Sequence, residues 1–182
     1  MAREDITSLY AIKRNFINQK SYDENMKEKP KFSLARKDEE ILDLVSKTDK
    51  KTLAVWAIDC AERVMPFFEE RYPKDKRPRK AIETLQEWIR TGIFKMSVIR
   101  KASLDSHAAA REVEEDNAAR SAARAAGQAV ATAHVARHAY GSAIYAQQAI
   151  HRATDSSDAV AKERDWQYQR LRDLGDGNHR NS

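Results

Sequence analysis

The feature that most constrains the fold is an alanine-rich, proline-free stretch from Asn117 to Ala153, NAARSAARAAGQAVATAHVARHAYGSAIYAQQAIHRA. Alanine has the highest intrinsic helix propensity, and its small side chain lets neighbouring helices approach closely. One uninterrupted helix over this stretch would be unusually long for a globular chain. We therefore predict a break near Gly127–Thr132 and two helices that pack closely. Gly127 and Gly141 lie where a larger side chain would block such an approach.

Most of the remaining chain has the three- and four-residue apolar spacing of amphipathic helices. Helices are expected over residues 38–48, 50–72, 79–92, 93–116 and 156–175. Asp49 is a candidate N-cap, Pro66 is expected to kink the second of these helices, and Gly92 is expected to end the third. No segment alternates apolar and polar residues as a strand does. The prediction is an all-α protein, a single bundle of about six to eight antiparallel helices with an alanine-rich core pair.

The 182 residues suit one domain with a core, and only five glycines and four prolines interrupt them. Residues 1–35 read as an N-terminal extension or linker, in which Ile6–Phe16 has the spacing of a short helix. The helical domain is expected over residues 36–174. Residues 175–182, which begin at Gly175, are expected to form a flexible tail.

Several protein classes are disfavoured by composition. The first residues, MAREDITSLY, contain acids and no apolar core of the kind a secretory signal needs. No segment approaches the length of apolar sequence that spans a membrane. The single cysteine, Cys60, cannot form an internal disulfide and is expected to be a buried, inert side chain. We expect a cytoplasmic protein of a prokaryotic type.

Positive charge is concentrated between Arg71 and Lys101. This segment holds ten of the 33 basic residues and three of the 28 acidic residues, whereas the rest of the chain is nearly balanced. The basic surface candidates are Arg71, Lys74, Lys76, Arg79 and Lys80. Such a block can attract nucleic acid, an acidic protein or anionic lipid, but charge runs most often form a solvated surface.

The sequence AHVARHAYG places His134 and His138 four residues apart, a spacing that shares one face of a helix. Metalloproteases use this spacing in H-E-x-x-H, where the glutamate is the general base. Here the sequence is H-V-A-R-H, so that class is excluded on its own motif, and no third metal ligand is identified. The pair is expected either to hydrogen-bond to a neighbouring helix or to form a polar binding site.

A second polar intrusion lies in the apolar sequence AVWAIDCAERVMPF. Asp59 and Arg63 are four residues apart, and Asp59 lies near the apolar stripe of Trp56 and Cys60. A carboxylate beside a core normally has a partner. The histidine pair could be this partner, and so could Arg77 or Arg79. The sharpest site hypothesis is a polar cluster of Asp59, Arg63, His134 and His138, which would either hold the core in register or form part of a binding cleft.

Motifs for catalysis and cofactor binding are missing from the sequence. There is no G-x-S-x-G nucleophile elbow, no G-x-x-x-x-G-K-[ST] phosphate loop and no G-x-G-x-x-G dinucleotide fingerprint. The three tryptophans stand at helical positions and are expected in the core rather than stacked on nucleobases. We therefore expect no enzyme activity, no cofactor and no metal.

Three stretches carry a family resemblance: LAVWAIDCAERVMPFFEERYPKDKRPRKAIETLQEW, AARAAGQAVATAHVARHA and ERDWQYQRL. Their order and spacing resemble the putative immunity protein family of bacteria and archaea, which has a helical immunity-five-like domain. The resemblance covers residues 35–174, and its most recognisable elements are Asp75–Ile82 and Ala131–Ala139. It implies an all-α binding protein that blocks a toxin. The positions that match the family's motifs are Asp59, Cys60, Arg63, Arg77, Pro78, His134 and His138.

Three functions stay open at this point. The first is a non-enzymatic immunity protein or other protein-binding module, whose toxin is expected to present an acidic or apolar surface because this chain is basic. The second is a nucleic-acid-associated protein that uses residues 71–101. The third is a metal-binding or catalytic protein built on His134, His138 and Asp59. A homodimer is also compatible with the alanine-rich helices, which can pack against their own copy.

Overall fold

The computed structural model describes residues 32–33 and 37–179. It divides into two units, Met1–Ser33 and Leu34–Ser182, and the helices below belong to the second. The predicted short helix at Ile6–Phe16 lies outside the described residues.

Seven helices account for most of the described residues, and no strand occurs among them. They are α2 (Glu39–Lys47), α3 (Lys50–Glu69), α4 (Arg77–Thr91), α5 (Met96–Glu112), α6 (Ala118–Ala131), α7 (His138–Thr154) and α8 (Ser157–His179). The predicted all-α bundle is confirmed.

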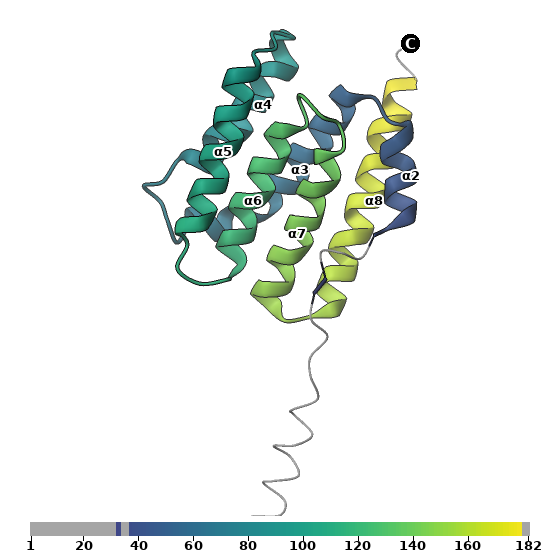
Figure 1. Ribbon diagram of the computed structural model, residues 1–182. Coiled ribbons are helices and arrows are strands. Elements are labelled where there is room, and N and C mark those ends of the chain that lie inside the picture. The colour runs from purple at the N-terminus through teal and green to yellow at the C-terminus, as the bar shows by residue number, and fades with distance from the viewer. Residues whose placement is uncertain (1–31, 34–36, 180–182) are drawn as a thin grey trace, which may run out of the picture. The chain divides into compact units, whose positions relative to one another are not determined.

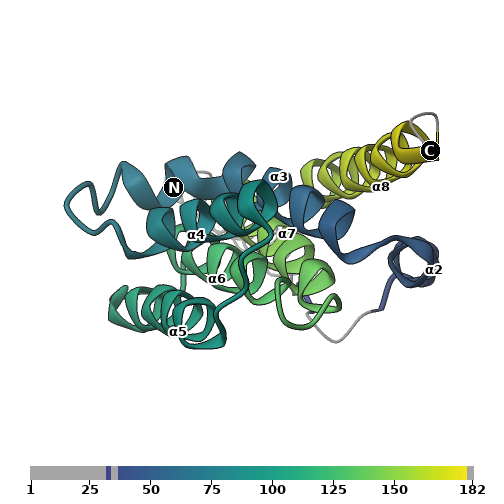
Figure 2. The same cartoon turned by 90° about the horizontal axis from the view of Figure 1, so that it is seen from above.

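The helices pack around α6, which contacts α3, α4, α5 and α7. Figure 2 shows α3 and α4 in one layer and α5, α6 and α7 in the layer beneath them. Helix α8 packs against α3 and α7, and α2 lies beside α8 at the edge of the bundle (Figure 1).

The core joins large side chains of one layer to small side chains of the other. Helix α3 buries its large apolar residues Leu53, Trp56, Met65 and Phe68, each at most 1% exposed. Helix α6 contributes almost only alanine to the core, together with Val130. Because alanine keeps the helix backbones close, α6 can contact four helices at once.

The two glycines of the alanine-rich stretch are explained by close approach. A Cβ atom at Gly127 would lie 3.0 Å from the ring of His107 on α5. A Cβ atom at Gly141 would lie 2.7 Å from Oε1 of Gln128 on α6.

Helix ends follow local rules in most places. The Asp49 side chain caps α3 by accepting from the backbone N–H groups of Lys51 and Thr52, as predicted. Gly92 ends α4 in the left-handed conformation, at a φ of 69°. The predicted division of the alanine-rich stretch into two helices is confirmed, but the break lies later than predicted: α6 continues through Gly127 to Ala131, and the break is at residues 132–137.

Several predicted helix boundaries were wrong, those of α5 and the end of α8 most clearly. The helix expected over 93–116 is α5, which begins at Met96 and ends at Glu112. Helix α5 begins later than predicted because the left-handed turn at Gly92 separates it from α4. It ends before Val113, whose side chain is buried in the core at 1% exposure. The helix expected to stop at Gly175 continues to His179, since glycine costs a helix only about 1 kcal/mol and no proline follows. Helix α3 continues without interruption through Pro66.

Candidate functional site

Arg63 and Glu163 form an ion pair that joins α3 to α8. The Arg63 guanidinium donates from Nε to both carboxylate oxygens of Glu163, at 3.2 and 2.9 Å, and its Nη2 lies 2.8 Å from Oε2. The Glu163 side chain is only 2% exposed, whereas that of Arg63 is 41% exposed. The guanidinium also stacks on Trp166, 3.9 Å from the ring centroid. Arg63 therefore neutralises a carboxylate that the core could not otherwise hold.

A buried amide continues this arrangement into the core. Gln167, fully buried, donates from Nε2 to Oε1 of Glu163 at 3.0 Å and to the carbonyl of Ala143 at 3.1 Å. Its Oε1 accepts from Gln147 of α7 at 2.8 Å. The indole N–H of Trp56 donates to the backbone carbonyl of Gln167 at 2.8 Å. The network ties α3, α7 and α8 in one register.

Asp59 does not join the histidines. Its carboxylate accepts from Nε of Arg170 on α8 at 2.8 Å. The hypothesis that Asp59, Arg63 and the histidine pair form one cluster is therefore wrong for the contacts in the described part of the chain. Asp59 and Arg63 both face α8, while the histidines lie at the junction of α6 and α7.

His134 and His138 do not share a helical face, because α6 ends at Ala131. The chain then tightens into a turn in which the N–H of His134 donates to the carbonyl of Ala131, three residues back. His134 is exposed in this turn, and His138 is the first residue of α7. The centroids of the two rings still lie 5.3 Å apart. The turn therefore brings the two histidine side chains together, where the sequence predicted that a shared helix face would do so.

His138 is tied to α6 through Gln128, whose Oε1 lies 2.7 Å from Nδ1 of His138. Burial, with a smaller contribution from His134, lowers the pKa of His138 from its ordinary value. Burial and the nearby Arg124 and Arg111 lower the pKa of His107 in the same way. His107 and His138 are thus held as neutral rings near pH 7.

The basic segment is largely neutralised by carboxylates of the same molecule. Arg77 binds Asp75 and also pairs with Glu112 of α5, and Arg77 in turn lowers the pKa of Asp75. Arg79 donates to Glu69 at 2.8 Å and pairs with Glu62, both on α3.

The remaining basic candidates lie at the surface. Arg71 lies 3.6 Å from Glu115, and both side chains are exposed. Lys74, Lys76 and Lys80 are exposed, and no ion pair involves them in the part of the chain that the structure describes. Arg77 and Arg79 therefore connect α4 to α5 and to α3, whereas Lys74, Lys76 and Lys80 carry free charge.

Nucleophile and metal chemistry find little support in the geometry. Cys60 is fully buried, and burial raises the pKa of its thiol well above the ordinary value. Within the described ranges, no three His, Cys, Asp or Glu side chains converge as metal ligands would. His134 and His138 thus lack a third ligand there.

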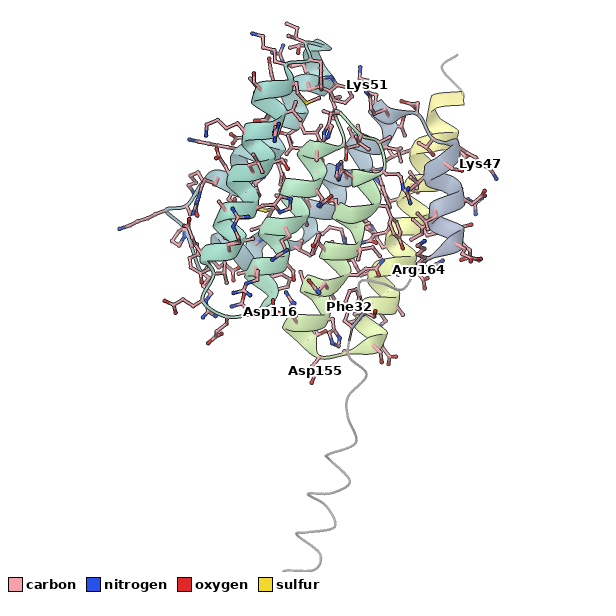
Figure 3. The ribbon with its side chains drawn as sticks, viewed as in Figure 1. Phe32, Lys47, Lys51, Asp116, Asp155 and Arg164 are labelled. Carbon is pink, nitrogen blue, oxygen red and sulfur yellow. The ribbon has the colours of Figure 1, made fainter. Side chains whose placement is uncertain are left out.

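The residues that complete these networks could not be identified from the amino-acid sequence. Glu163, Gln167 and Arg170 stand on α8 among other charged residues, and their partners on α3 are about 100 residues away along the chain. Arg164 is similar: it holds Asp38, the N-cap residue of α2, at 2.6 Å and also pairs with Glu40. Arg164 is labelled in Figure 3, beside α8 and below α2. The sequence feature that could have pointed to these partners is the small number of apolar residues on α8.

A surface feature was also missed at the turn between α4 and α5. Ile93, Phe94, Met96 and Val98 are 44 to 64% exposed, and Ile93 and Val98 line a hollow of about 540 Å³. Trp88, which the sequence places in the core, is half-buried and lines this hollow. Side chains of this kind favour contacts with another molecule.

No helix in the described part of the chain has the length and apolar character that crossing a membrane requires. No curated protein and no solved structure gives a significant match to the chain. The family model described as "Imm-5 like putative immunity protein" matches residues 43–174, well over half of the sequence. This match contains the α3–α8 network, the α6–α7 turn and the α4–α5 turn, and by it the chain belongs to the Imm-5 like putative immunity protein family.

Proposed function

We propose that the chain is a non-enzymatic immunity protein that binds a protein toxin and blocks it in the cytoplasm of a prokaryotic cell. The observation that carries this proposal is the set of contacts made by the polar residues that match the family's motifs. Asp59, Arg63 and Arg77 all bond to side chains of another helix. They stabilise the bundle and do not surround a reacting atom, so recognition at the surface is favoured over catalysis.

Family membership supports the same function. The match spans every helix from α3 to α7 and part of α2 and α8, so the whole bundle is the unit that the family shares. An immunity protein needs a stable scaffold and a surface complementary to its toxin, and it needs no reactive group. A buried thiol and a His138 ring that is hydrogen-bonded to Gln128 are consistent with that role.

Nucleic-acid binding through residues 71–101 is less favoured by these contacts. Phosphate recognition requires free Arg and Lys side chains, and the affinity then depends steeply on salt. Arg77 and Arg79 each face two carboxylates. Reversing them to glutamate would break these ion pairs, so the pair of substitutions cannot serve as a clean test of phosphate binding.

The test is neutralisation of toxins encoded next to the gene in its source genome. Each toxin domain is expressed in a host cell with and without the full chain, and growth is measured together with complex formation by size-exclusion chromatography. We expect restored growth and a stable complex with one toxin. Growth arrest by every toxin despite folded, soluble chain would contradict the proposal.

The α6–α7 turn is the first surface to vary in that test. His134→Ala/His138→Ala removes the exposed ring and the bond to Gln128, with circular dichroism as the folding check. Arg172→Ala, at an exposed position of α8, is the matched control. A folded double variant that loses the toxin, beside a control that keeps it, would place the histidines in the binding surface. Unchanged binding would leave them with a structural role.

A further inference from the structure

The turn between α4 and α5 presents apolar side chains where a soluble protein usually presents polar ones. We name the α4–α5 corner as Trp88 together with Ile93, Phe94, Met96 and Val98. Ile93 is 64% exposed, Met96 and Val98 are 49% exposed, and Phe94 is 44% exposed. They stand within six consecutive residues. Ile93 and Val98 line the hollow of about 540 Å³, and Phe94 and Met96 lie between them in the chain. Single exposed apolar residues are common, but a contiguous group beside a hollow marks an interaction site.

The corner is not a poorly packed part of the core. Ile99, the next residue after Val98, is only 3% exposed and belongs to the main core, so the start of α5 is properly docked. Trp88 packs against that core with one side and borders the hollow with the other. Because burial of apolar surface is favourable, a partner that covered these side chains would gain binding free energy. Tryptophan, phenylalanine and methionine are also enriched at the centres of protein interfaces.

The charges around the corner are mainly positive. Lys80 and Lys95 line the hollow, Arg100 is exposed on α5, and none of the three has an ion-pair partner in the described ranges. Glu87 is already paired with Arg90, at 2.6 Å, which leaves Glu83 as the acidic side chain without such a partner at the hollow. The ammonium of Lys50 lies 5.7 Å from the Trp88 ring centroid. A partner surface must therefore offer negative charge around an apolar centre.

We propose that the α4–α5 corner is the docking surface for a protein partner whose apolar side chains are flanked by Asp and Glu. This proposal rests on the proposed function, under which the partner is the toxin. The apolar side chains enter the hollow beside Trp88 and cover Phe94 and Met96. The flanking carboxylates meet Lys80, Lys95 and Arg100, which set the orientation of the complex.

Charge argues against a second copy of this chain as the occupant. In a two-fold symmetric dimer the same patch lies on both sides of the interface. The lysines and Arg100 of one copy would then approach those of the other around the same apolar centre. Like charges brought together at an interface oppose association.

The test uses a displayed library of random peptides selected on the full-length protein, which needs no knowledge of the natural toxin. Phe94→Ser/Met96→Ser removes the apolar centre, and Lys80→Glu/Lys95→Glu reverses the rim. Leu104→Ser is the matched control, because Leu104 is an apolar residue of α5 that is 53% exposed and lies outside the corner. Selected peptides are synthesised and their affinities are measured for all four proteins.

We expect the selected peptides to combine apolar residues with Asp and Glu. Both corner variants should bind them about tenfold more weakly or worse, and the control should bind like wild type. Peptides that are basic, peptides that bind the corner variants unchanged, or a selection without enrichment would overturn the proposal. A wild-type dimer in sedimentation that Phe94→Ser/Met96→Ser converts to monomer would assign the corner to a second copy, which also overturns it.

The same variants separate this inference from the proposed function. If the wild type neutralises a toxin and both corner variants neutralise it equally well, the chain is an immunity protein whose docking surface lies elsewhere. If no toxin is neutralised but acidic apolar peptides depend on the corner, the docking chemistry holds and the immunity function is wrong.

Discussion

Helices α6 and α7 and the α4–α5 corner use apolar residues in opposite ways. The alanine-rich pair buries its small side chains almost completely, and Ala126, Ala129, Ala143 and Ala146 have no exposed surface. The corner leaves large side chains in solvent, with Ile93 at 64% exposure. Burial energy per residue is smallest for alanine and large for isoleucine and phenylalanine. The alanine-rich pair and the corner therefore differ in the property for which their apolar residues are suited.

In the alanine-rich pair the selected property is distance between backbones. Many short side chains allow α6 to contact four helices, and the hydroxyl of Ser142 can donate to the carbonyls of Ala57 and Ala125, at 3.0 Å each. In the corner the selected property is an accessible surface. Apolar residues of this chain therefore serve packing in the alanine-rich pair and are available for recognition in the corner.

The largest effect is expected from enlarging an alanine of the pair. Ala143→Leu adds three heavy atoms at a fully buried site, where the added volume forces neighbouring helices apart. We expect a loss of about 3 kcal/mol in the free energy of unfolding, measured by urea denaturation. Ala161→Leu, at an exposed position of α8, should change it by less than about 0.5 kcal/mol. Equal effects of the two variants would show that the pair is not closely packed.

A smaller loss is expected from removing the counter-ion of a buried carboxylate in the same core. Arg63→Met leaves Glu163 buried without its guanidinium partner. We expect a cost of about 2 kcal/mol, below the usual value for a buried pair because Arg63 is partly exposed and screened by solvent.

The double variant Arg63→Met/Glu163→Gln provides the control for that substitution. It should recover at least half of the loss, because the second change removes the uncompensated charge. A double variant no more stable than Arg63→Met would show that lost packing on Trp166, and not charge, was responsible.

Acidification should act on the alanine-rich layer and not on the corner, which contains no histidine. The folded-state pKa values of His107 and His138 are lowered from 6.5, so the unfolded chain binds protons more readily than the folded one. The stability from the neutral rings is complete above the unfolded pKa, and is lost as pH falls from about 6.5 through the folded values. We expect the urea midpoint to drop between pH 7.5 and 5.

His107→Gln/His138→Gln tests the origin of this pH dependence. Glutamine preserves hydrogen-bonding ability without a proton-binding ring, so the midpoint of the variant should change less over the same range. A variant with the full wild-type slope would assign the effect to other groups.

The smallest effect on stability is expected at the corner. Phe94→Ser should lower the free energy of unfolding by about 1 kcal/mol, since Phe94 is 44% exposed and loses only part of the burial of a core side chain. Ile99→Ala, five residues along and buried, should cost about 3 kcal/mol. If Phe94→Ser were as costly as Ile99→Ala, the corner would be part of the core and the comparison would fail.

The fold was accessible from sequence because its signals are local. Asp49 as N-cap, Gly92 as helix end and the interruption of the alanine-rich stretch each depend on residues a few positions apart. The candidate site was less accessible. Asp59 and Arg63 were recognised as polar residues in need of partners, but the partners are Arg170 and Glu163, about 100 residues away. Residues 71–101 were recognised as basic, without any sign that Arg77 and Arg79 each face two carboxylates.

The sequence by itself determined that this chain is helical, where most helices begin and end, and that an alanine-rich pair packs closely. Propensity, capping and apolar spacing act over a few residues and can be read along the chain. Only the tertiary structure decided which charges are paired, that His134 and His138 meet across a turn, and that Ile93, Phe94, Met96 and Val98 are exposed while Ile99 is buried. Pairing and exposure depend on which helices face each other, and that is set by the packing of the whole bundle.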